Sequence, residues 1–285
     1  MIHVLHSNQN QPAASHQAKP RELGTSDHVE LALFIACLAL MALGAYGPTV
    51  VQSSHYHAFA DQRSLLDVPN MMDVLSNLAF TCFGVVGAWR IRLLPQGVLS
   101  PAQTNLARLF FAGLVLTAAF SGWYHLQPED HGLAIDRYGM TIAFSGLLGL
   151  AVATRVGDRA GQWLTLAVLL FGAWSIRTWL TSTNVLQWAV LQYGGIALMA
   201  GLACLTPREG ALPVSWITVI LAYALAKVLE QSDAQVYHLT GELVSGHTLK
   251  HIVASFAALP VVAAISRASH PLESSARCAA ISAKR

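Results

Sequence analysis

Long apolar runs separated by short polar segments make up most of this chain. Eight of these runs are long enough to cross a bilayer, since about 20 residues at 1.5 Å rise span about 30 Å. Pro and Gly mark several of the connections between them. The pattern predicts an all-α, polytopic membrane bundle with spans near Leu31–Val51, Met72–Ile91, Leu106–Leu126, Leu133–Ala153, Gln162–Leu180, Val185–Leu205, Pro213–Glu230 and Gly246–Ile265.

The two ends of the chain do not share this pattern. Residues 1–30 are rich in Gln, Ser, Ala and His and show no helical apolar period, which predicts a disordered cytoplasmic tail. This polar lead is too long for a signal peptide, so we expect the run at 31–51 to be a retained anchor helix. Residues 267–285 form a second polar tail.

The composition agrees with a membrane protein. Hydrophobic residues make up 54% of the chain and charged residues only 11%, against about a quarter in soluble proteins. None of the four cysteines forms a CxxC pair, which excludes a thiolate zinc site of that kind. The net charge of +2 gives no indication of a nucleic-acid partner, and the composition makes the lipid bilayer the expected surroundings.

The basic residues are divided unevenly between the two ends of the predicted helices. With eight crossings, the two termini share one side, and most of the 17 Lys and Arg residues fall on it. Cytoplasmic loops carry the excess of Lys and Arg, so both termini are expected in the cytoplasm, at the inner membrane if the source is bacterial. The opposite, outward side receives only Arg63, Arg137, Arg177, Lys227 and Lys250.

Two histidines open the last apolar run. His247 and His251 are four residues apart, so on a helix they share one face and can hold one metal ion. Helix parity places His125, at the end of the third run, on the same outward face. Three imidazoles with one open position describe a catalytic zinc site, in which water is the fourth ligand. Glu230 and Asp233 are further candidates for orienting a ligand imidazole.

Two other polar residues fall at the same face. Ser121, one turn before His125, is placed to donate to a developing oxyanion, and Asp136 to orient or accept the proton of a water. Simpler interpretations stay open at this point. The histidines can be hydrogen-bonded core residues, Asp136 can pair with Arg137, and Ser121 can bond back to its own helix.

These residues resemble a known family. Ser121-x3-His125, Asp136 eleven residues later and His247-x3-His251 resemble the alkaline ceramidases, whose wider superfamily includes the adiponectin and progestin receptors. The segment from Asp73 to Phe80 is similar to the Ser-Asn signature in that family's first helix, and the similarity covers roughly residues 61–266. The helix at 31–51 is then an addition before a seven-helix core.

The resemblance implies an intramembrane zinc amidase that splits the N-acyl bond of a sphingolipid such as ceramide, releasing a long-chain base and a fatty acid. It implies that His125, His247 and His251 are the zinc ligands. It also implies that Ser121 and Asp136 are the polar partners of the metal-bound water.

Eukaryotic members of that family also bind calcium, through an acidic loop before their first helix. This chain has Asp61 and Asp67 there, but it lacks the Asp-Trp-x-Glu-x-Asn run, and Asn70 stands where the family has a glutamate. Calcium is therefore a second, open candidate. Two rival functions also stay open: a receptor-like or regulatory relative that turns nothing over, and a haem protein with transmembrane histidine ligands.

Overall fold

The computed structural model describes residues 25–269, and this part of the chain is helical, without a β-strand. Only isolated bridges occur within it, at Val51 with Asn184 and at Leu65 with Val68. The prediction of an all-α fold is confirmed. Six of the described helices are long and apolar enough to cross a membrane, which indicates a multi-pass membrane protein. They are Asp27–Tyr46, Met71–Arg92, Pro101–Leu126, Asp158–Ser182, Leu186–Ala203 and Gly246–Ala268.

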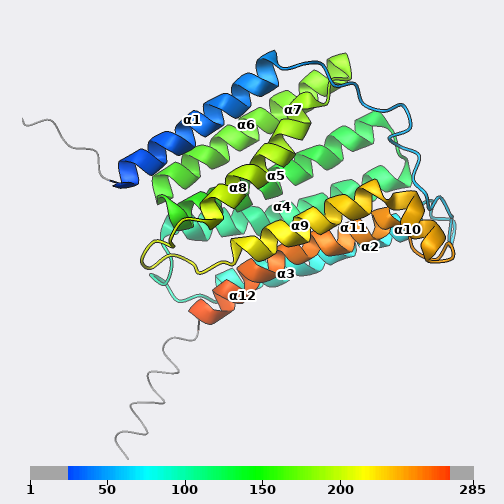
Figure 1. Cartoon of the computed structure of the whole chain (residues 1–285). Helices are drawn as coiled ribbons and strands as arrows, with labels where there is room; N and C mark the ends of the chain where they lie inside the picture. The colour runs from blue at the N-terminus through cyan, green and yellow to red at the C-terminus, as the bar shows by residue number, and fades with distance from the viewer. Residues whose placement is uncertain (1–24, 270–285) are drawn as a thin grey trace, which may run out of the picture.

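The helices lie side by side in one bundle (Figure 1). The start of α1 and the end of α12 lie at one end of the bundle, on the left in Figure 1, whereas α10 lies at the other. In chain order the elements are α1 Thr25–Tyr46, α2 Met71–Ser76, α3 Leu78–Arg92, α4 Pro101–Leu126, α5 Asp130–Arg155, α6 Asp158–Ser182, α7 Leu186–Ala189, the π-helix η1 Val190–Gly194, α8 Gly195–Ala203, α9 Trp216–Gln231, α10 Asp233–Leu239, α11 Gly246–Ser255, the 3₁₀ turn η2 Phe256–Ala258 and α12 Leu259–Ala268.

The first helix is displaced from its predicted position. It begins at Thr25 and ends at Tyr46, so residues 25–30 are helical rather than part of a disordered tail. The hydropathy pattern did not predict this start, because the first turns of α1 are polar. An acidic residue such as Asp27 is favourable there, since the N-terminal end of a helix dipole is positive. Pro48 disfavours helical geometry at the residue before it, which ends α1 before Val51. The earlier residues of the predicted tail lie outside the described range.

Three predicted spans contain breaks that hydropathy does not reveal. The run predicted from Met72 divides at Asn77 into α2 and α3. The run from Val185 contains η1, a π-helical turn between α7 and α8. The last run contains the η2 turn between α11 and α12. The break at Asn77 matters most, because α2 brings polar residues to the site described below.

Helices α4 and α5 pack with their backbones in close contact. A Cβ atom at Gly146 would lie 2.4 Å from the backbone nitrogen of Phe110, so only glycine fits there. Small residues that let two helices approach are a common device in membrane bundles. The contact fixes α4 and α5 relative to each other, and these two helices carry Ser121, His125 and Asp136.

Candidate metal centre

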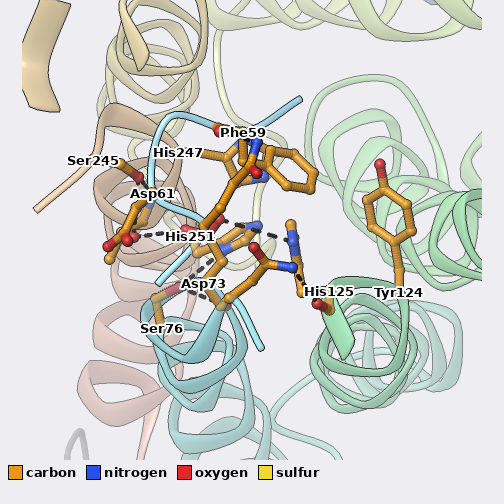
Figure 2. Close-up of polar contacts among 12 residues, drawn as sticks. Phe59, Asp61, Asp73, Ser76, Tyr124, His125, Ser245, His247 and His251 are labelled. Carbon is orange, nitrogen blue, oxygen red and sulfur yellow. Dashed lines mark hydrogen bonds and ion pairs between the residues drawn. The ribbon is translucent and has the colours of Figure 1, made fainter. Parts of the chain in front are cut away.

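Three buried histidines converge between α4 and α11. Each of His125, His247 and His251 offers a ligand atom, and these atoms all lie within 4.8 Å of one another. The ring centroids are 4.8–5.0 Å apart. The side chains are almost wholly buried, with at most 8% of any residue exposed. The structure therefore brings together the three predicted metal ligands, as Figure 2 shows.

The start of α11 is held firmly, which fixes two of these ligands. Ser245 caps the helix, its hydroxyl accepting a hydrogen bond from the Thr248 backbone N–H at 3.0 Å. Asp233 accepts a second bond from the backbone N–H of His247 at 2.7 Å. A Cβ atom at Gly246 would lie 2.4 Å from the Leu229 carbonyl oxygen, so α11 begins directly against the end of α9.

Helix α2 orients the ring of His251. The Ser76 hydroxyl lies 2.8 Å from Nδ1 of His251 and also donates to the Asp73 carbonyl oxygen at 2.9 Å. Because its one proton is used there, Ser76 accepts from Nδ1–H of His251, and Nε2 is left for a metal. Ser76 belongs to the segment that resembles a family signature, and its role at the ring is found only in the structure.

His125 faces the carboxylate of Asp73, the first residue of the signature-like segment, to which the sequence had assigned no role. Oδ2 of Asp73 lies 3.9 Å from Nδ1 of His125, and neither atom has a hydrogen-bond partner in the described part of the chain. The other oxygen of Asp73 accepts from the Thr248 hydroxyl at 2.6 Å. Asn70 donates to the backbone carbonyl of His125 at 2.9 Å. At 3.9 Å the two groups form no hydrogen bond, but the Asp73 carboxylate lies where a small approach would make it a partner of the His125 ring.

His247 contacts a lysine of its own helix. Nζ of Lys250 lies 3.0 Å from Nε2 of His247 and 3.2 Å from a carboxylate oxygen of Glu230, which also pairs with Lys227. Like Asp73, Lys250 is a charged residue at the site that had not been predicted to belong to it. Charged residues inside apolar helices are usually functional, so Asp73 and Lys250 both carried a usable signal.

A loop residue covers the cluster at the end of the bundle that carries α10. The ring of Phe59 is 6% exposed and lies 4.4 Å from the ring of His247 and 4.7 Å from that of His125. Figure 2 shows it packed beside both imidazoles. Phe59 lies in the loop between α1 and α2, where nothing in the sequence marked it.

The two predicted catalytic residues, Ser121 of α4 and Asp136 of α5, lie next to each other. Ser121 and Asp136 are buried, 3% and 8% exposed, and the hydroxyl of Ser121 is a hydrogen-bonding neighbour of the Asp136 carboxyl group. Asp136 also interacts electrostatically with Lys250. One of its oxygens, Oδ1, has no hydrogen-bond partner among the described residues. The alternative in which Asp136 forms an ion pair with Arg137 is not seen in this range, although the Arg137 charge also acts on the Asp136 carboxyl group.

The residues considered for calcium are arranged differently. Both oxygens of Asp61 accept from Arg63, at 2.8 and 2.6 Å, and the Arg63 guanidinium holds the pKa of that carboxyl below its usual range. Asp67 is exposed, and Asn70 is engaged with His125. Among the described His, Cys, Asp and Glu residues, the metal-competent cluster is the histidine triad. This arrangement gives calcium no support.

A comparison of the sequence with protein-family models and with curated proteins finds no match. The chemistry of this site therefore has to be argued from its own residues.

Proposed function

We propose that this protein is a zinc-dependent amide hydrolase of the bilayer that acts on ceramide or a similar N-acyl lipid. The observation that carries the proposal is the convergence of three buried imidazoles, with a buried Ser–Asp pair on α4 and α5, one of which also carries His125. The ceramidase-like spacing of the same residues in the sequence adds to it.

The donor set fits zinc. Neutral imidazoles are preferred zinc ligands, and catalytic sites hold the ion through three protein groups with one position open. His125, His247 and His251 would hold the ion, and their ligand atoms already lie within 4.8 Å of one another. A zinc ion held there supplies a Lewis acid and lowers the pKa of a bound water to about 7.

The protein side chains around the triad have distinct tasks in such a reaction. Asp136 accepts a proton from the attacking water while the water oxygen bonds to the amide carbonyl carbon. Ser121, next to Asp136, donates to the carbonyl oxygen as negative charge develops on it. Asp136 then returns the proton to the leaving nitrogen as the C–N bond breaks. The products are a fatty acid and an amine, a long-chain base if the lipid is ceramide.

We further infer that α5 and α9 cross the membrane with the six apolar spans, which gives a seven-helix core preceded by α1. Helix α5 has 26 residues, about 39 Å at 1.5 Å per residue, and packs between α4 and α6. An even number of crossings agrees with α1 starting and α12 ending at one end of the bundle (Figure 1). From the charge distribution in the sequence, we infer that both termini are cytoplasmic and that the site faces outward, at the inner membrane if the source is bacterial.

The haem alternative is disfavoured by the packing of the rings. Axial histidines must leave room for a flat macrocycle, whereas these three rings lie within 5.0 Å of one another and Phe59 packs against two of them. A receptor-like relative would keep the metal and lack turnover.

The decisive experiment measures metal content and lipid release together. Detergent-purified wild-type protein is expected to contain one zinc ion per chain and to release fatty acid from a labelled N-acyl sphingoid lipid. His247→Ala should lose both properties, whereas His238→Ala, an exposed histidine on α10, should keep both. Zinc-free wild type, or full zinc retention by His247→Ala, would refute the metal site. Zinc without lipid release would favour the receptor-like alternative.

A further inference from the structure

A buried arginine lines the polar cavity next to the metal centre. This cavity of about 400 Å³ is bordered by the α1–α2 loop, α5, α7, η1, α9 and the start of α11. His247 contributes to its wall, so the cavity reaches the histidine cluster. Arg137 of α5 contributes to the same wall, although only 2% of the residue is exposed.

The guanidinium of Arg137 is incompletely paired. Its Nη2 donates to the side-chain oxygen of Gln52 at 2.7 Å, whereas Nε and Nη1 have no hydrogen-bond partner within residues 25–269. No carboxylate of the described chain forms an ion pair with it. Instead it lies over aromatic rings, 4.2 Å from the centroid of Trp179 and 5.3 Å from that of Trp188.

The other charged groups of the cavity are engaged. Glu230 is shared by the ammonium groups of Lys227 and Lys250. The two oxygens of Asp233 accept from the backbone N–H groups of His247 and Ala60, at 2.7 and 2.9 Å. Arg137 therefore stands out as the cavity's cation with donors to spare. A buried charge usually has a partner, because removing it from water is costly.

We propose that Arg137 binds an anionic group of the lipid, such as a carboxylate or phosphate, beside the metal centre. Two N–H groups of a guanidinium can donate side by side to the two oxygens of such an anion. These charge-assisted hydrogen bonds are about twice as strong as hydrogen bonds between neutral groups. The side-chain amide oxygen of Gln52, a residue of the α1–α2 loop, occupies one guanidinium donor until the anion displaces it.

This inference rests on the proposed function for the identity of the lipid. The acidic group lies either on the amine side of the N-acyl bond or on the released fatty acid, and both sources present the same pair of oxygens. In the first case the preferred substrates are N-acyl lipids with an acidic headgroup. In the second case Arg137 holds the product carboxylate.

The test compares two matched pairs of ligands on zinc-loaded protein in a neutral detergent. N-lauroylglycine is paired with N-lauroylglycinamide, and lauric acid with lauramide, so each pair differs in charge at equal chain length. Binding is measured by calorimetry, separately from hydrolysis. We expect the acid of at least one pair to bind about 10-fold to 100-fold more tightly than its amide. A preference in the first pair identifies the headgroup, and one in the second pair the product.

The variants connect this preference to one residue. Arg137→Gln should abolish it, whereas Arg177→Gln, the same change at an exposed position of α6, should leave it intact. Arg137→Lys keeps the charge without the planar fork and should give an intermediate preference, so the test stands even if the glutamine variant does not fold. Zinc content and melting temperature report on folding.

The possible results separate this inference from the proposed function. Equal affinities for acid and amide in both pairs, or an unchanged preference in Arg137→Gln, would overturn the anion site. An Arg137-dependent preference without cleavage of any N-acyl lipid would support the anion site and count against the hydrolase.

Discussion

The unpaired carboxylate oxygen of Asp73 gives the sharpest test of the metal centre. The Asp73 side chain is completely buried, and its Oδ2 lies 3.9 Å from Nδ1 of His125, itself without a partner in the described chain. When Nε2 of His125 binds a metal, Nδ1 carries the proton, and a small closure of the site lets it donate to Asp73. We therefore expect Asp73→Ala to weaken zinc binding while leaving all three ligands in place.

The magnitude follows from the bond that is lost. A hydrogen bond to a charged group contributes about 1.5–3 kcal/mol, which corresponds to roughly a 10-fold to 150-fold change in an equilibrium constant. Loss of such a partner to a metal-binding histidine typically costs about 10-fold to 100-fold in affinity. Asp73→Asn should fall between wild type and Asp73→Ala, because the amide can still accept from Thr248.

The assay is a competition titration of zinc against a chromophoric chelator, on protein purified in detergent. Asp61→Asn is the matched control, because Asp61 is equally buried but pairs with Arg63 instead of a histidine. It should lower stability without lowering zinc affinity. Wild-type affinity in Asp73→Ala, within about twofold, would refute the role given to Asp73.

Three further changes test the scaffold. Ser245→Ala removes the cap of α11 and should cost about 1 kcal/mol, lowering both the melting temperature and zinc affinity. Gly146→Leu should destabilise the bundle by about 1–3 kcal/mol through overpacking against Phe110, seen in thermal unfolding. Arg63 lowers the folded-state pKa of Asp61, so its stabilisation is present above the unfolded pKa of about 3.9 and is lost as pH falls through the folded value. Melting temperatures recorded from neutral to acidic pH should therefore fall less steeply in Asp61→Asn than in wild type.

The helical class and the three metal-competent histidines could be predicted from the sequence for simple physical reasons. In a bilayer, the backbone polar groups of a spanning segment must form hydrogen bonds with each other, which a helix allows. Long apolar runs therefore predict helices directly. Two histidines four apart share a helical face, and counting crossings brings His125 to the face of His247 and His251.

The surroundings of the histidines could not be predicted, because they depend on contacts between distant segments. The approach of Asp73 to His125 depends on the packing of α2 against α4 and α11. The packing of Phe59 depends on the path of a loop with no periodic pattern. The Asp136–Arg137 pairing was plausible from adjacency, but consecutive helix residues point about 100° apart and meet different neighbours.

The position of Phe59 has a kinetic consequence. Its ring packs against two of the three imidazoles, and Phe59 and His247 both line the cavity that reaches the cluster. If a metal binds here, an ion would therefore pass the Phe59 ring on its way from the cavity to the histidines. The rate of metal release would then depend on the movement of this ring as well as on equilibrium affinity.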